Sequence, residues 1–210
     1  MRMVIGSNST PYSMSFSAGS LLHYESVHLA ALYLDLGNYR SVRKTVVAEN
    51  LLQTRTQSTC MRICQEVLTR LQALNRDEIE FLVDCSHQEQ PHLLWVAICR
   101  RYRFIGEFAV EVLREHHLNL KSRLGHEDFD LFFNKKSEWN PELDDLSTNT
   151  RNQLRWVLFK MLRELEYLNK QNHIQPPILS RKLLELLYRN NPEDVMCFPV
   201  NESDMKSTLR

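Results

Sequence analysis

Apolar residues recur at helical spacing from Ser20 to Asn190, and the alternating pattern of a β-strand is nearly absent. Residues three and four positions apart share one face of an α-helix, so this period predicts helices that each bury one side. Only 5 glycines occur in the chain. We therefore expect an all-α fold, a compact bundle of about eight to ten helices, with at most a minor wing or hairpin near the C-terminus.

Capping residues mark the expected helix ends. Ser20 can cap a first helix, and Gly37 suits the left-handed position after that helix ends. Asn38 can then cap a second helix. Further expected caps are Asn75 with Glu78 as a capping box, Ser147 or Thr148, and Ser180 before a last helix from Arg181 to Asn190.

The run LLWVAIC, residues 93–99, predicts a central helix buried on most sides, with Pro91 as its first residue. Three arginines follow it: Arg100, Arg101 and Arg103. They can extend a basic surface, or they can neutralise the carbonyl groups at the C-terminus of this helix. Gly106 then allows a close crossing or a break.

The chain divides into four expected segments. Residues 1–19 form an extended arm, residues 20–124 an N-terminal helical lobe and residues 125–199 a C-terminal lobe. Residues 200–210 are expected to be a disordered tail. Trp156 lies on the polar side of its helix, and we expect it to pack between the two lobes.

Each expected lobe contains a candidate helix-turn-helix. In the first, a helix with Cys64, Val67 and Leu71 on one side begins at a polar run around Gln57. The opposite side carries Thr59, Arg62, Glu66, Thr69 and Arg70. An exposed ladder of ion pairs explains that side equally well, at only about 0.3–0.5 kcal/mol per pair.

Positive charge favours the nucleic-acid interpretation of this side. Residues 40–76 contain seven basic and two acidic side chains, a net charge of about +5 in an otherwise neutral chain. A helix N-terminus offers free N–H groups to a phosphate, and arginine adds forked donors. We expect phosphate contacts from Arg40, Arg43, Lys44, Arg55, Thr56, Ser58 and Arg62, with Gln57 a candidate for reading a base edge.

The second candidate helix-turn-helix lies in residues 125–165 and places Arg151 and Arg155 near the start of a long helix. Lys135 and Lys136 join them as a second contact region, in which Asn152 is a candidate base contact. The segment NHIQPPILS, residues 172–180, would suit a small wing or loop. We expect the binding to be largely tolerant of DNA sequence.

Composition limits the other classes of function. Lys+Arg 26 balance Asp+Glu 26, which excludes a uniformly basic protein that coats nucleic acid. The N-terminus is too polar for a signal peptide, and no apolar run is long enough to span a bilayer, so we expect a cytoplasmic protein that does not bind membranes. We also expect a monomer. Five cysteines without framework spacing predict apolar packing and no disulfides.

The sequence lacks the usual marks of an enzyme. It contains neither a phosphate-binding loop nor an H-E-x-x-H pair. Cys85, His87 and His92 resemble zinc ligands, but a fourth ligand at recognisable spacing is missing. His116 and His117 are adjacent and diverge by about 100° on a helix. We expect no catalysis, cofactor, metal or small-molecule substrate.

Three long segments stand out: YSMSFSAGSLLHYESVHLAALYLDLGNYRSVRKTVVAENLLQTRTQSTCMRICQEVLTRLQAL, LLWVAICRRYRFIGEFAVEVLRE and LSTNTRNQLRWVLFKMLRELEYL. With a late CFP, they resemble the BrxA family, a small core component of bacteriophage exclusion (BREX) systems. The resemblance covers Tyr12 to Pro199, and its most specific piece is N-L-L-Q-x-R-T-x-S. It implies a non-enzymatic, all-helical accessory protein of phage defence that binds double-stranded DNA beside other BREX subunits.

Two alternatives stay open. The same helix face can serve as an adaptor for an acidic partner, such as a methyltransferase or ATPase subunit of the defence complex. An arginine-rich helical bundle can also bind RNA. Two helix-turn-helix candidates favour duplex DNA, because a helix fits the major groove of B-form DNA and not the narrow groove of A-form RNA.

Overall fold

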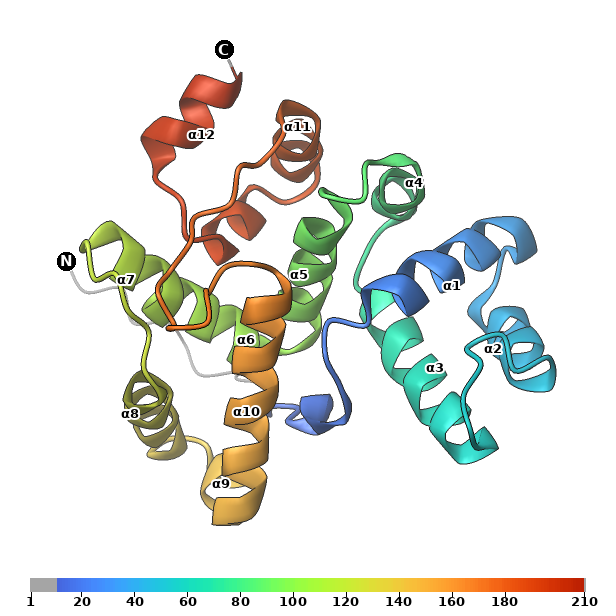
Figure 1. The fold of residues 1–210 in the computed structure, drawn as a ribbon, viewed down its shortest axis with the longest axis horizontal. Coiled ribbons are helices and arrows are strands. Elements are labelled where there is room, and N and C mark those ends of the chain that lie inside the picture. Colours follow the sequence, from blue (N-terminus) through green and yellow to red (C-terminus); the bar gives the residue numbers. More distant parts are fainter. Residues whose placement is uncertain (1–10, 210) are drawn as a thin grey trace.

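The computed structural model describes residues 11–209, apart from the side chains of residues 17 and 18. Within this range it is all-α: no β-strand forms, and twelve α-helices follow one another (Figure 1). Their bounds are α1 His23–Leu36, α2 Tyr39–Ala48, α3 Gln57–Leu71, α4 Arg76–Asp84, α5 Gln90–Arg101, α6 Arg103–Phe108, α7 Glu115–Leu118, α8 His126–Ser137, α9 Pro141–Asp144, α10 Thr148–Glu164, α11 Arg181–Asn190 and α12 Glu202–Leu209.

Three segments of other helix types complete the described backbone. A 3-10 turn, η1, covers Ser15–Ala18, and another, η3, covers Pro192–Cys197. A π-helical stretch, η2, covers Ala109–Arg114 and joins α6 to α7 without a break. The number of α-helices exceeds the expected eight to ten for two reasons. The continuous helical stretch of α6, η2 and α7 is counted as two α-helices, and α7 and α9 are single turns.

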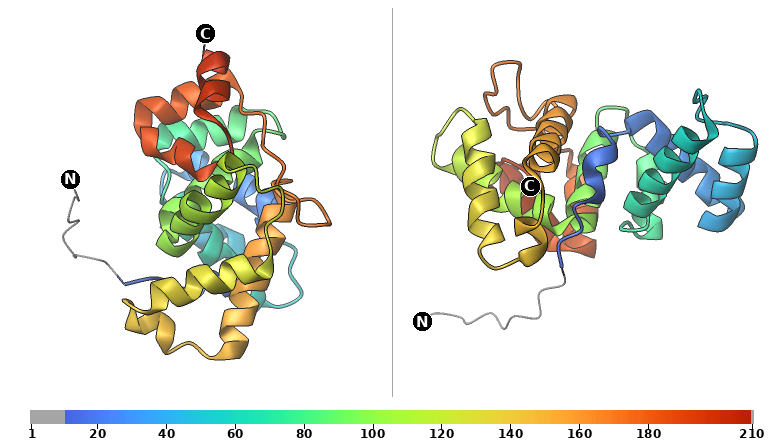
Figure 2. Two further views of the ribbon diagram at one scale, coloured as in Figure 1. Left: turned by 90° about the vertical axis from the view of Figure 1, so that its left-hand side faces the viewer. Right: turned by 90° about the horizontal axis from the view of Figure 1, so that it is seen from below.

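Helix α5 is the centre of the core, as expected. Every residue of its segment 93–99 is buried, and the indole N–H of Trp95 donates to the carbonyl of Cys197, 2.9 Å away. Helices α1, α2 and α3 lie together at one end of the molecule, whereas α8, α9 and α10 lie on another side (Figures 1 and 2). This arrangement keeps the two groups of expected DNA-binding residues apart.

Most of the expected caps are present. The side chains of Asn38, Ser147 and Ser180 each accept a bond from a backbone N–H in the first turn of the helix that follows. Asn75 and Glu78 form the capping box, and Gly37 ends α1 with a φ of 74°. These contacts are local, so the sequence alone could predict them.

The first helix begins later than expected. Leu22 is its N-cap residue, with a φ of 54° and no side-chain cap, and Ser20 does not cap it. The carbonyl groups of Ser20 and Leu21 instead accept hydrogen bonds from Arg70 Nη1, at 3.0 and 3.1 Å. This long-range contact holds the segment outside the helix. Pro91 is likewise the second residue of α5, not the first.

Two further expectations are wrong. The chain after Pro199 is not a disordered tail, because α12 forms and its Met205 is only 3% exposed. Trp156 does not pack between two lobes, because it is 54% exposed to solvent. The minor wing or hairpin expected near the C-terminus takes the form of single antiparallel bridges, Arg123 with His173 and Leu168 with Ile174.

Arg100, in the last turn of α5, fits neither expected role. Arg100 donates to the carboxylates of Glu78 and Asp194 at 2.7 and 2.6 Å, so it ties α5 to α4 and η3. Burial alone would raise the pKa of Glu78, but the hydrogen bonds from Arg100 and Asn75 lower it overall. Gly106 makes the expected close crossing, because a Cβ there would lie 2.9 Å from the carbonyl oxygen of Cys99.

Candidate nucleic-acid interface

The α2–α3 basic surface consists of five exposed cations on α2, α3 and their connection: Arg40, Arg43, Lys44, Arg55 and Arg62. On α2, Val42 and Val46 are fully buried, which turns the three cations of that helix toward solvent. Helix α3 packs on α2, and both helices lie at one end of the molecule (Figure 1).

None of these five side chains forms an ion pair with a carboxylate of residues 11–209. Their positive charges are therefore available to an external anion. Exposed charges of one sign attract an oppositely charged partner over about 10 Å at moderate salt.

Helix α3 begins inside this surface. Thr56 is its N-cap residue, and its hydroxyl oxygen accepts a hydrogen bond from the backbone N–H of Thr59 at 3.2 Å. The hydroxyl oxygens of Thr56 and Ser58 lie 3.1 Å apart. Gln57 and Ser58 are exposed in the first turn. An N-terminus of this kind favours negative charge through its free N–H groups and its dipole.

The connection between α2 and α3, residues 49–56, is longer than the roughly three to four residues of a helix-turn-helix turn. Asn50 holds it together, because its side-chain oxygen accepts from the N–H of Thr54 and its amide donates to the carbonyl of Thr54, both at 3.1 Å. Asn50 and Gln53 both have positive φ values, 47° and 50°. Sequence reasoning did not give Asn50 this role, although asparagine tolerates a left-handed backbone and commonly bonds nearby backbone groups.

The exposed ladder expected on α3 is only partly present. Arg62 is exposed, but Glu66 and Arg70 are buried as an ion pair of 2.8 Å. The hydroxyl of Tyr102 also donates a hydrogen bond to Glu66, at 2.5 Å. Burial is the main cause that raises the pKa of Tyr102 to about 12, and the hydrogen bond to Glu66 is the second. Helix α3 packs against α1 and α2 and also against α5 and η1, so its polar side is partly enclosed.

The second expected group lies on α8 and α10, and all four of its cations are paired. Lys136 contacts Glu107 and Glu111 at 2.5 and 2.6 Å, and Lys135 contacts Glu111 at 3.6 Å. Burial alone would lower the pKa of Lys136, but its bonds to these carboxylates raise it overall. Lys136 is therefore held charged, and both lysines are compensated by carboxylates.

The two arginines of α10 share one acceptor. Arg151 and Arg155 both contact Asp130, at 3.1 and 2.5 Å, and Arg155 also donates to the side chain of Asn152 at 3.0 Å. These bonds join α8 to α10. A phosphate at this place would compete with Asp130 for the same donors.

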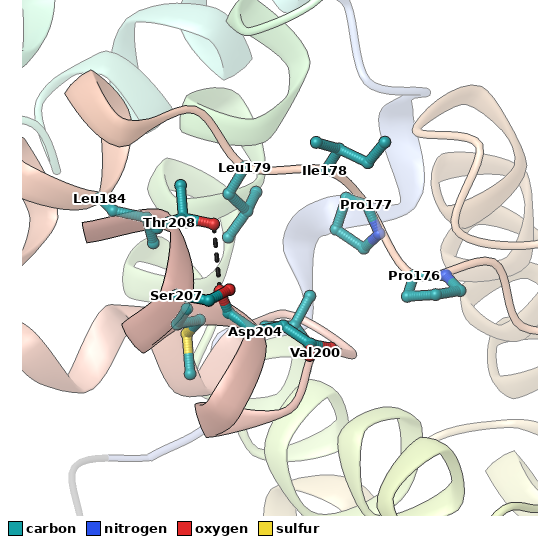
Figure 3. A pocket seen from close by; sticks show the side chains of 10 residues that line it. Pro176, Pro177, Ile178, Leu179, Leu184, Val200, Asp204, Ser207 and Thr208 are labelled. Carbon is teal, nitrogen blue, oxygen red and sulfur yellow. Dashed lines mark hydrogen bonds between the residues drawn. The ribbon is translucent and has the colours of Figure 1, made fainter. Parts of the chain in front are cut away.

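A hollow elsewhere offers no comparable site. It has a volume of about 360 Å³ and lies between residues 176–179 and α12, and most of its lining residues are apolar (Figure 3). Its one charged lining residue is Asp204, whose backbone carbonyl accepts a hydrogen bond from the hydroxyl of Thr208. An acidic side chain there disfavours phosphate.

The histidines and cysteines do not converge on a metal site within the described part of the chain. His92 lies 2.9 Å from the hydroxyl of Tyr167, and burial lowers its pKa to about 4. The ring of His87 instead contacts that of His23, with centroids 4.5 Å apart. Cys60 and Cys64 are buried, which confirms their expected packing role. In residues 11–209, none of the helices combines the length and the apolar character needed to cross a membrane.

Comparison with known proteins identifies the family. A family model described as BrxA matches residues 10–191. The chain belongs to the BrxA family. The match covers α1 to α11 and stops before α12, so the last helix lies outside the part that the family model describes.

Three curated relatives carry the name "BREX protein BrxA". The protein from Escherichia coli O9:H4 (strain HS) is 23% identical over 85% of this chain and 84% of its own length. The relative from Bacillus cereus (strain H3081.97) is 26% identical over 69% and 74%. The one from Paramagnetospirillum magneticum (strain ATCC 700264 / AMB-1) is 23% identical over 90% and 97%. None of these three names states an enzymatic activity.

A solved structure shares the fold. The crystal structure of an uncharacterized protein from Magnetospirillum magneticum aligns with a TM-score of 0.76 and 21% identity, covering 90% of this chain and 97% of the other. The two chains therefore share one helical arrangement although most of their aligned positions differ.

Proposed function

We propose that this chain is a non-catalytic component of a BREX phage-defence system that binds double-stranded DNA through the α2–α3 basic surface. Membership of the BrxA family and the relatives named "BREX protein BrxA" support the place in BREX. One observation carries the DNA-binding part: five exposed cations lie on α2, on α3 and on the connection between them, and none has a carboxylate partner among residues 11–209.

The contacts of this surface fit a phosphate backbone better than a set of bases. Arginine forks and a helix N-terminus bind phosphate oxygens without reading sequence. Gln57 is exposed in the first turn of α3 and is our candidate for a base-edge contact. We expect affinity to depend strongly on salt and weakly on DNA sequence.

The group on α8 and α10 is a secondary contact region in this proposal. Lys135, Lys136, Arg151 and Arg155 would keep their carboxylate partners or exchange them for phosphate, and Asn152 would have to release Arg155 to reach a base. We therefore expect this region to contribute less to affinity than the α2–α3 basic surface.

Binding of another BREX subunit is the second candidate function. Three of the exposed large apolar side chains lie on or next to α8 and α10: Leu131 at 68%, Trp139 at 82% and Trp156 at 54% exposure. Aromatic side chains on a surface favour protein contacts. The methyltransferase and ATPase subunits are the partners we would test first.

Fluorescence anisotropy with a labelled duplex of about 20 bp tests the DNA proposal. The Arg55→Ala, Arg62→Ala double variant should bind at least about tenfold more weakly than the wild type, since each loss removes a phosphate contact. The matched control is Arg76→Ala, Arg181→Ala, which removes two exposed arginines engaged in surface ion pairs of their own helices. Circular dichroism confirms that both variants fold.

An RNA hairpin in the same titration separates the alternatives. Tighter binding of the hairpin than of the duplex would favour the RNA-binding alternative. Equal duplex affinity for the wild type and the Arg55→Ala, Arg62→Ala variant would contradict the DNA proposal and direct attention to a protein partner.

A further inference from the structure

A second hollow, the α3 hollow, opens beside the inner side of helix α3. It has a volume of about 440 Å³ and lies between η1, α3 and the junction of α5 with α6. Arg62, Gln65 and Thr69 line it from α3, and Arg101 and Tyr102 line it from the junction. Ser15 of η1 completes the wall. Segments far apart in the sequence thus meet around one opening.

Two arginines of this wall lack a carboxylate partner in the described part of the chain. Arg62 is exposed, and Arg101 is partly buried, with its Nε buried and without a hydrogen-bond partner. The Arg101 guanidinium lies 5.1 Å from the centre of the Tyr102 ring, which holds it by a cation–π contact. A guanidinium with a buried, unpartnered Nε is costly to enclose, and an anion in the hollow would offset part of that cost by attracting its positive charge.

The one acidic residue of the wall is already compensated. Glu66 accepts hydrogen bonds from the buried Arg70 at 2.8 Å and from the Tyr102 hydroxyl at 2.5 Å. Arg70 therefore offsets the charge of Glu66, and the charges of Arg62 and Arg101 are left uncompensated. The side-chain amide of Gln65, exposed at the same wall, adds a neutral donor.

We propose that the α3 hollow binds a phosphate group, with Arg62 and Arg101 as its charged donors. Two guanidinium groups match the three oxygens of a phosphate, and the hollow is large enough to admit the group. The phosphate belongs either to the backbone of bound DNA or to a free phosphorylated ligand. Only the first source rests on the proposed function.

The first test measures binding of inorganic phosphate and adenosine monophosphate by calorimetry, and of the labelled duplex by anisotropy. Arg101→Gln removes a donor, and Gln65→Glu places a negative charge at the opening without touching the core. Each should weaken phosphate binding by about tenfold or more. The controls, Arg181→Gln and Gln171→Glu, make the same charge changes at exposed positions outside the hollow and should stay within about twofold.

The arms of this experiment separate the two sources. Parallel loss of duplex and phosphate binding in both hollow variants assigns the site to backbone phosphate. Loss of phosphate and adenosine monophosphate binding alone assigns it to a free ligand. Circular dichroism checks the fold, and Gln65→Glu keeps the test valid if Arg101→Gln is unstable.

Failure of this inference differs from failure of the proposed function. If both hollow variants bind all three probes as the controls do, while Arg55→Ala with Arg62→Ala loses the duplex, the hollow is not a phosphate site and the DNA proposal stands. If the wild type binds phosphate in the hollow but no duplex, the reverse holds.

Discussion

The buried side chain of Arg70 donates hydrogen bonds to three acceptors. Its Nε donates to Glu66, and its Nη1 donates to the carbonyls of Ser20 and Leu21. A charged side chain enters a protein interior only when such partners replace its water. Arg70 thereby joins α3 to the chain entering α1.

Replacing Arg70 alone should be strongly destabilising. Arg70→Met leaves the Glu66 carboxylate buried without its counter-ion, which typically costs about 3–5 kcal/mol in the free energy of unfolding. Urea unfolding followed by circular dichroism measures this loss. The double variant Arg70→Met, Glu66→Gln removes both charges and should recover a large part of it. A loss below about 1 kcal/mol in the single variant would contradict the burial of this pair.

Glu78 should make stability depend on acidic pH. Its pKa is lowered in the folded protein, because the bonds from Arg100 and Asn75 outweigh the effect of burial. The unfolded chain therefore binds the proton more readily, so the stabilisation is present above the unfolded pKa of about 4.3 and is lost as the pH falls through the lower folded value.

Urea unfolding at a series of pH values from about 7 to 3 measures this effect. The free energy of unfolding should fall less steeply with acid in Glu78→Gln than in the wild type. Glu80→Gln is the control, because Glu80 makes only an exposed ion pair with Arg76. Equal slopes for the wild type and Glu78→Gln would show that Glu78 is not the residue responsible.

At the scale of elements, α12 shows how a short amphipathic segment acquires a fixed place. Met205 and Val200 are buried beside α11, whereas Lys206 on the next position is exposed. A helix of this length is marginal alone, and its apolar contacts stabilise it. The sequence after Pro199 has no long apolar stripe, so its pattern indicated disorder.

Substitutions in α12 can test whether the helix is docked. Met205→Ala should lower the free energy of unfolding by roughly 2 kcal/mol or more, because it removes buried methylene groups and leaves a cavity. Lys206→Ala, one residue away and exposed, should have little effect. Thermal unfolding of both variants measures the difference. Equal melting temperatures would mean that α12 is not packed in solution.

For the molecule as a whole, the groups of basic residues differ in whether carboxylates pair with them. The chain has as many basic as acidic residues, yet the cations of the α2–α3 basic surface are unpaired and those of α8 and α10 are paired, among the residues described. The neutral total therefore hides a group of exposed cations that no carboxylate of residues 11–209 compensates by an ion pair. This division predicts where DNA binding should depend on salt.

The salt dependence of duplex binding should reflect this division. If the five cations of the α2–α3 basic surface each neutralise a phosphate, log K should fall with log salt at a slope of about −4.5. Arg55→Ala with Arg62→Ala should reduce the slope by about 1.8, and Arg151→Gln with Arg155→Gln should change it by less than about 0.5. Anisotropy at several salt concentrations gives the slopes. A flat dependence in the wild type would contradict backbone binding.

Local features were predictable from the sequence for a physical reason. Helical period, the caps at Asn38, Ser147 and Ser180, and the buried run of α5 depend on residues a few positions apart. The same is true of the exposed cations on α2, since Val42 and Val46 fix the opposite face. These features determined the all-α fold and the location of the basic segment.

Partners distant in the sequence were decided only by the tertiary structure. Arg100 meets Asp194, Arg70 meets Ser20, and Arg151 meets Asp130, and no periodicity connects such pairs. Whether a cation is free or compensated depends on these contacts. The sequence thus determined which residues carry charge, and packing determined which charges remain available, because ion pairing requires proximity in space rather than along the chain.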